Sequence, residues 1–210
     1  MKSCAIVCIA VFGTLGLLGQ IVLAQESKVY PHHDMPAMDQ VPGDSLYQLS
    51  VTLLTAEKET LKLADLRGHP LLVTMFYSHC SSVCPLLTAQ LQRMVNRLSP
   101  ADRQQIRILM VSFDAARDTP AALTAFKNEH HIQDAHWIIA RASASDVREL
   151  AATLGIRYRE LPDHTFNHSA IISITDLDGT VRASATEITA TDAAFVQAVR
   201  AQVARASRQP

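Results

Sequence analysis

Two cysteines, Cys80 and Cys84, are the residues of this sequence best suited to metal or redox chemistry. They lie in the segment His79-Cys80-Ser81-Ser82-Val83-Cys84-Pro85, and the only other cysteines are Cys4 and Cys8. Thiolates are soft ligands that favour Cu(I), zinc or iron–sulfur clusters. A closed zinc site needs four ligands, so two cysteines and one further ligand fit a low-coordinate copper site better. A metal site is therefore predicted, with a local disulfide or a thiol–disulfide couple as the alternatives.

The spacing of the cysteines favours a metal over a redox couple. Thioredoxin-type enzymes use a C-x-x-C motif, whereas three residues separate Cys80 from Cys84. Such enzymes also carry a cis-proline before a late strand, and here no proline occurs between Pro162 and Pro210. A dithiol that reduces one dedicated partner is compatible with both observations.

The pair is expected where a buried strand meets a helix. Residues 71–77 form an apolar run typical of a strand covered on both faces. After Pro85, apolar residues recur with a helical period to about Leu98. Free N–H groups at a helix start favour a nearby thiolate and lower its pKa. Ligands of α/β folds commonly bind at such strand ends.

The rest of the pattern alternates strands with helices. A loosely alternating strand over 46–51 is turned into a hairpin by polar residues 55–60. Further strands are predicted at 106–113, 137–140, 170–175 and 181–185, and helices after Asp118-Thr119-Pro120, over 145–154 and over about 191–205. This order predicts an α/β, thioredoxin-like fold: a mixed central sheet flanked by helices, with an extra N-terminal β-hairpin.

The N-terminal residues predict export. Lys2 precedes an almost wholly apolar run from Ala5 to Ala24, typical of a signal peptide cleaved after Ala24; the alternative is an uncleaved membrane anchor of about 20 residues. Residues 25–44 contain prolines and no apolar period, which indicates a flexible tether. A folded domain at 45–208 would then lie in the periplasm, soluble or attached to the inner membrane.

The tether contains four side chains capable of binding copper: His32, His33, Met35 and Met38. They could capture or hand over copper, but we favour a solvated linker of chance composition. Nucleic acid is not an expected partner, because the net charge is −1 and only 5% of residues are aromatic.

Three segments resemble the Sco/SenC family of copper chaperones for cytochrome c oxidase assembly. Residues 77–85 are similar to its [FY]-T-H-C-x-x-x-C-P, residues 112–120 to its S-x-D-P-x-R-D-T-P, and residues 163–169 to its D-x-x-x-x-H-[ST]. The resemblance covers roughly residues 45–205. The sequence departs from these motifs at four positions: Ser78 replaces a threonine, Ser81 and Ala115 replace prolines, and Asn167 replaces a frequent aspartate. None of these departures removes a ligand.

The resemblance implies one copper ion, Cu(I) or Cu(II), held by Cys80, Cys84 and His168. His79 and Asp163 are expected to tune or orient this site. His164 is expected to face solvent. The remaining histidines of the domain are expected at the surface without partners, and they are His69, His130, His131 and His136. The implied acceptor of the copper is the binuclear centre of cytochrome c oxidase subunit II. A periplasmic copper donor would supply the ion to this protein.

These expectations describe a metallochaperone rather than a turnover enzyme. The main alternative is a thiol–disulfide oxidoreductase that reduces the acceptor's cysteines, which would need Cys80 and Cys84 but not His168. A copper- or redox-sensing component is a weaker alternative, because the sequence shows no output domain. Peroxide reduction is weaker still.

Overall fold

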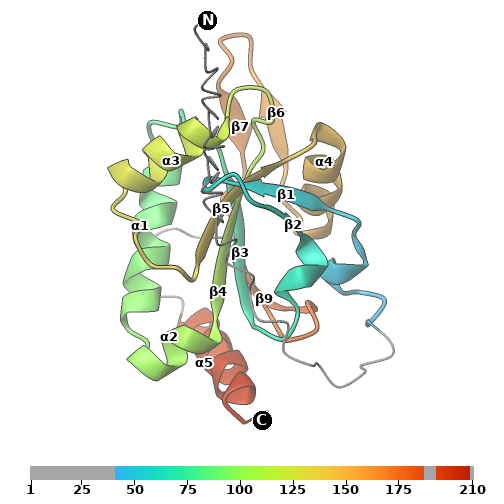
Figure 1. Ribbon diagram of the computed structural model, residues 1–210, viewed down its shortest axis with the longest axis vertical. Coiled ribbons are helices and arrows are strands. Elements are labelled where there is room, and N and C mark those ends of the chain that lie inside the picture. Colours follow the sequence, from blue (N-terminus) through green and yellow to red (C-terminus); the bar gives the residue numbers. More distant parts are fainter. Residues whose placement is uncertain (1–40, 187–192, 209–210) are drawn as a thin grey trace, which may run out of the picture. The chain divides into compact units, whose positions relative to one another are not determined.

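A seven-stranded mixed sheet forms the centre of the fold in a computed structural model, which describes residues 41–186 and 193–208 (Figure 1). The strand order is β2-β1-β5-β4-β3-β8-β9, and β6 and β7 form a separate antiparallel pair. The strands are β1 (Thr52–Thr55), β2 (Thr60–Lys62), β3 (Leu71–Phe76), β4 (Arg107–Ser112), β5 (Trp137–Ala142), β6 (Tyr158–Glu160), β7 (Phe166–His168), β8 (Ile172–Thr175) and β9 (Val181–Ala185).

Five α-helices and two 3₁₀ helices are present among the described residues. They are η1 (Leu46–Gln48), η2 (Leu63–Leu66), α1 (Val83–Asn96), α2 (Pro100–Gln105), α3 (Pro120–Glu129), α4 (Ala144–Thr153) and α5 (Ala193–Ala206). The side chains of Ser99, Thr119 and Ser143 cap α2, α3 and α4 by accepting a backbone N–H, as their residue types favour. No helix in this part of the chain is long and apolar enough to span a bilayer.

The order of connections places a ligand-binding position at the carboxyl end of β3. The parallel strands β3, β4 and β5 are joined through α1 and α3. Two crossovers of the same hand and direction put both helices on one face, and Figure 1 shows α1 and α3 on one side of the sheet and α4 on the other. The chain later returns to the other edge of β3 as the antiparallel β8. Strand order therefore reverses at β3, where open α/β sheets bind ligands.

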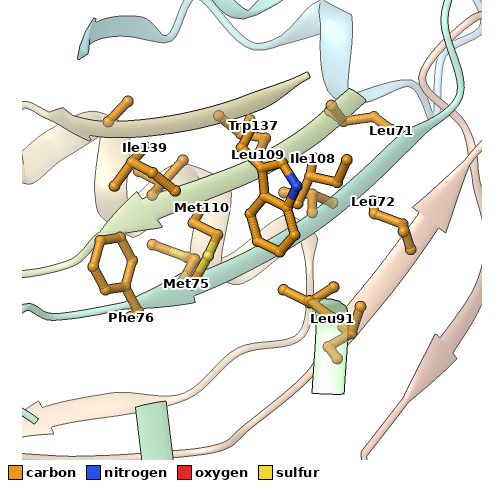
Figure 2. Close-up of a cluster of buried hydrophobic side chains, with 14 of the residues drawn as sticks. Leu71, Leu72, Met75, Phe76, Leu91, Ile108, Leu109, Met110, Trp137 and Ile139 are labelled. Carbon is orange, nitrogen blue, oxygen red and sulfur yellow. The ribbon is translucent and has the colours of Figure 1, made fainter. Parts of the chain in front are cut away.

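A close-packed core holds this end of the sheet. All six residues of β3 and five of six in β4 are buried, in keeping with their continuous apolar runs. Figure 2 shows Met75 and Phe76 of β3 near Met110 of β4 and Ile139 of β5, and all four are buried. Interiors packed in this way have low compressibility, so the end of β3 and the start of α1 are firmly positioned.

The predicted mixed sheet with flanking helices is confirmed, but the N-terminal hairpin begins later than expected. Residues 46–48 form η1 instead of a strand. The Ser45 hydroxyl accepts the Tyr47 N–H, and the Leu49 N–H returns to the carbonyl of Leu46. Leu46 and Tyr47 are both buried. In a strand with one face toward solvent, one of two neighbouring residues would be exposed, because successive side chains point to opposite faces.

Several predictions concern residues outside the described ranges. The signal peptide or anchor at 1–24, the tether with His32, His33, Met35 and Met38, and the start of the last helix before residue 193 all fall there. They stay predictions.

Position 179, in the turn between β8 and β9, requires a glycine because of both its backbone conformation and its neighbours. Its φ is +82°, and a Cβ atom would lie 2.6 Å from Cδ2 of Tyr47. Gly155, which ends α4 with a φ of +68°, has nothing within 4 Å of such an atom. We expect Gly179→Ala to lower the free energy of unfolding by about 3 kcal/mol, through left-handed strain and overlap. Gly155→Ala should cost about 1 kcal/mol, through strain alone. Urea denaturation measures both, and equal losses would contradict the part assigned to Tyr47.

Candidate metal centre

Cys80, Cys84 and His168 come together beyond the carboxyl end of β3. Their ligand atoms all lie within 4.8 Å of one another, and Sγ of Cys84 is 3.9 Å from Nε2 of His168. Metal bonds to such sulfur and nitrogen atoms are about 2.0–2.3 Å long, so two ligands of one ion are at most about 4.6 Å apart. The three groups thus need only small shifts to bind a single ion. Neither cysteine forms a disulfide.

The strand–helix junction expected for the cysteine pair is present. After β3 ends at Phe76, the Cys80 N–H donates to the carbonyl of Tyr77 at 3.3 Å and closes a turn. Cys84 lies in the first turn of α1, and its N–H donates to Sγ of Cys80 at 3.3 Å. This is the contribution that a helix start makes to a nearby thiolate. Cys84 is fully buried and Cys80 is 8% exposed.

The two cysteines differ in acidity. A hydrogen bond from the Cys84 thiol lowers the pKa of Cys80 well below the usual thiol range; burial opposes this, and His168 with the N–H groups of Cys84 and Ser82 lowers it further. The same hydrogen bond, together with burial, raises the pKa of Cys84. The reduced pair therefore consists of a Cys80 thiolate and a Cys84 thiol. Binding of a metal ion by both sulfurs must release the Cys84 proton.

This asymmetry predicts the order of alkylation. At pH 6 an ordinary thiol with a pKa of about 8.5 is almost wholly protonated, whereas Cys80 should react with iodoacetamide and Cys84 should not. Cys84→Ala removes the hydrogen-bond donor, so the pH midpoint of the Cys80 reaction should move upward. Timed alkylation followed by peptide mass spectrometry measures both changes. A parent Cys80 that begins to react only near pH 8 would rule out the thiolate.

His168 ends β7 and is oriented by its own backbone. It pairs with Tyr158 across the β6–β7 hairpin. Its Nδ1 lies 3.2 Å from the carbonyl oxygen of Ser169. A carbonyl only accepts, so Nδ1 donates to it, and Nε2, which faces Cys84, is the nitrogen that can bind a metal ion once it carries no proton.

An aromatic cluster surrounds this imidazole. The ring centroid of His168 is 4.9 Å from that of Phe113 and 6.0 Å from that of Tyr77. Phe166 packs on both of these rings, and its N–H donates to the Tyr77 hydroxyl at 3.4 Å. The cluster limits rotation of the imidazole and access of water from this side. Sequence reasoning missed the hairpin, although residues 158–160 and 166–168 each begin with an aromatic residue and lie on either side of Pro162-Asp163, a typical turn pair.

Asp118 is a buried carboxylate that sequence reasoning assigned only to a helix start. Thr119 caps α3, and Asp118 is fully buried behind the cysteine loop. It accepts hydrogen bonds from the N–H and hydroxyl of Ser78, at 2.9 and 2.5 Å, and from the hydroxyl of Ser112 at 2.5 Å. The carboxylate thus joins the end of β4 to the residue two before Cys80. Thr119 alone is sufficient to cap α3. A second residue of the capping type, Asp118, was therefore the sequence signal for a further role.

Arg117 connects the same segment to the hairpin that carries His168. Its guanidinium forms an ion pair with Asp114, donates to the carbonyl of His164, and lies 5.7 Å from the ring centroid of Phe166. Residues 112–120 therefore hold both halves of the site, the cysteine loop through Asp118 and the hairpin through Arg117.

The two residues predicted to tune the site lie at its margin. The His79 side chain is 64% exposed, and its Nδ1 is 2.9 Å from the Ser78 hydroxyl. Asp163 accepts the N–H and hydroxyl of Thr165 at 3.0 and 2.7 Å, and these hydrogen bonds lower the pKa of its carboxyl group. These contacts stabilise the loop of the hairpin. Tuning by His79 and orientation by Asp163 stay predictions.

The expectation that the other histidines lack partners is wrong for several of them. His69 and His136 both contact the guanidinium of Arg107, and His130 packs on Phe126 with centroids 4.3 Å apart. Apolar ring faces and arginine neighbours account for these positions without a metal.

The fold and the site together define a thioredoxin-like protein with a candidate metal centre of two thiols and one imidazole. Residues 41–204 match the family described as SCO1/SenC. The chain belongs to this family, which confirms the resemblance seen in its three motifs.

Individual relatives are distant in sequence but similar in fold. The SCO1 protein homolog of Bacillus subtilis is 25% identical over 101 residues, which cover 48% of this chain and 52% of that protein. A SCO1/SenC family lipoprotein from Bacillus anthracis superposes with a TM-score of 0.66 at 16% identity, over 73% of this chain and 94% of that one. Copper-bound ScoI from Bradyrhizobium japonicum gives a TM-score of 0.59 at 20% identity, over 72% and 96%.

Proposed function

We propose that this protein is a copper chaperone that holds one copper ion through Cys80, Cys84 and His168. The observation that carries the proposal is the approach of three ligand atoms to within 4.8 Å of one another. Family membership and the copper-bound ScoI relative support it. The chaperone would deliver copper to the binuclear centre of cytochrome c oxidase subunit II. It would act in the periplasm, soluble or attached to the inner membrane by residues 1–24, and receive its ion from a periplasmic donor.

The donor set suits a transferable copper ion. Two thiolates favour Cu(I), and the imidazole is a good ligand for either Cu(I) or Cu(II). Three ligands leave space for a fourth from an acceptor, so the ion can move by ligand exchange without being released into water. Cys80 is already a thiolate, and only the Cys84 proton must leave when copper enters.

A dedicated dithiol reductant is the second candidate, favoured by the hydrogen-bonded thiolate–thiol pair. The Cys80 thiolate would attack an acceptor disulfide, forming a mixed disulfide and releasing one acceptor thiolate. Cys84, once deprotonated, would then displace the second acceptor thiolate and leave a Cys80–Cys84 disulfide. No cis peptide bond occurs in the described part of the chain, so the cis-proline typical of general thioredoxin-type enzymes is not found there.

Copper stoichiometry of the reduced full chain tests the proposal. One tightly bound Cu(I) per chain is expected, and none in the Cys80→Ala/Cys84→Ala double variant. The loaded protein is then mixed with the copper-free soluble domain of subunit II, and the copper in each is measured after separation. A parent with reactive thiols but no tightly bound copper would exclude the chaperone and leave the dithiol reductant.

A further inference from the structure

An open groove lies between α4, residues 113–116 and the β6–β7 hairpin, which carries His168. Its volume is about 810 Å³. Phe113 and Tyr158 stack with centroids 5.3 Å apart and an interplanar angle of 17°, and Phe166 lies 5.1 Å from Phe113. These rings make one side of the groove aromatic. Alanines of α4 contribute small side chains elsewhere in the lining, which leaves space for an apolar side chain of a partner.

The charged residues of the groove leave a net positive rim. Arg148, Arg157 and Arg159 line it and are exposed, and none of their guanidinium groups forms an ion pair or hydrogen bond with the described residues. The acidic lining residues are already engaged: Asp114 pairs with Arg117, and Glu160 pairs with His164. The whole chain carries a net charge of −1, so this excess of positive charge is local.

The positive rim continues to the metal centre. A second hollow of about 390 Å³ is lined by Arg157, Arg159 and His168. Arg159 pairs with Asn167 across the hairpin, next to the Tyr158–His168 pair. A molecule that approaches the ion from the side of His168 would therefore meet these arginines.

We propose that this groove docks an acidic segment of the copper acceptor that also carries an aromatic or aliphatic side chain. The inference rests on the proposed function, because it states the chemistry of the partner that receives the ion. Carboxylates would pair with the three arginines and the apolar side chain would pack on the aromatic side. An anionic membrane surface matches the charge but not the shape, because a lipid surface does not enter a concave groove lined with aromatic rings.

The test measures binding of a probe peptide to the full reduced chain. The probe is Glu-Glu-Phe-Glu-Glu, and its partner peptide has lysine at every glutamate position. The variant is Arg148→Glu/Arg157→Glu/Arg159→Glu. The matched control reverses three exposed arginines away from the groove, Arg97→Glu/Arg200→Glu/Arg205→Glu. Isothermal titration at low and high salt gives affinities, and retention of one copper per chain shows that each variant is folded. If the triple variant loses copper, Arg148→Glu alone, on the exposed face of α4, replaces it.

The proposal expects the acidic peptide to bind the parent and the basic peptide not to bind. The groove variant should weaken binding at least about tenfold, as three exposed charge pairs would, and added salt should weaken parent binding. The control should bind like the parent. Failure of the acidic peptide to bind, or equal binding by the groove variant, overturns the proposal. So does arginine-dependent binding of phosphatidylglycerol vesicles without binding of the peptide.

Copper transfer to the subunit II domain separates this inference from the proposed function. If the groove variant holds copper but transfers it to that domain at least about tenfold more slowly, while a small-molecule chelator removes it at the parent rate, the groove serves the acceptor. Peptide binding with no transfer from the parent would leave the groove in place and remove subunit II as acceptor. Normal transfer without peptide binding would keep the proposed function and remove the groove.

Discussion

His168→Ala should lower Cu(I) affinity by at least about a hundredfold, since loss of even an outer partner of a metal ligand costs about 10–100-fold. The dithiol should keep its chemistry. The Cys84 thiol is the main cause of the lowered pKa of Cys80 and His168 a lesser one, so the variant keeps most of the thiolate character of Cys80. The result would separate the two candidate functions, which share both cysteines. Competition with a chromogenic Cu(I) chelator gives the affinity, and reduction of a model disulfide gives the dithiol rate.

His164→Ala is the matched control for this substitution. His164 lies on the same hairpin, its side chain is 73% exposed, and it pairs with Glu160 at 2.8 Å rather than with a cysteine. Copper affinity should stay within about twofold of the parent, because an exposed pair contributes little. Parent-like copper affinity in His168→Ala would remove the imidazole from the ligand set. Equal loss of copper binding and dithiol reduction would indicate general damage to the site.

Local patterns were sufficient to predict the cysteine half of the site. The buried run of β3, the helical period of α1 and the two cysteines at the junction of these elements all lie within residues 71–96. A strand buried on both faces and a helix with one apolar stripe each leave a direct signal in sequence. The residues between such elements are then placed by the fold.

The histidine half could not be predicted from local patterns. His168 is 84 positions from Cys84, and no periodicity relates two residues so far apart; the resemblance to family motifs supplied the pairing. Asp118 was missed for a different reason. A capping role explained the Asp-Thr-Pro segment well enough, while burial of its carboxylate depends on Ser78 and Ser112. Long-range hydrogen bonds of this kind become visible only when the strands are assembled.

Asp118→Ala is expected to lower the free energy of unfolding by about 4 kcal/mol, because it leaves one buried and two partly buried donors without their acceptor. These are the N–H and hydroxyl of Ser78 and the hydroxyl of Ser112. Since Ser78 is two residues before Cys80, the cysteine loop should also loosen and Cu(I) affinity should fall. Urea denaturation and the chelator competition measure the two effects. For comparison, Asp65→Ala removes an exposed carboxylate with one backbone donor, the Lys62 N–H at 2.7 Å, and should cost only about 1 kcal/mol.

Asp118→Asn shows whether the carboxylate acts through hydrogen bonds or through charge. Its amide oxygen can replace Oδ2, which accepts both the Ser78 N–H and the Ser112 hydroxyl. The Ser78 hydroxyl can rotate to accept from the amide NH₂. If hydrogen bonding is what matters, stability and copper affinity should stay close to the parent, with a loss of about 1 kcal/mol. An asparagine variant as unstable as the alanine variant would instead assign the effect to the buried negative charge. If Asp118→Asn keeps the stability and copper affinity that Asp118→Ala loses, Asp118 serves the metal centre by fixing the backbone before Cys80.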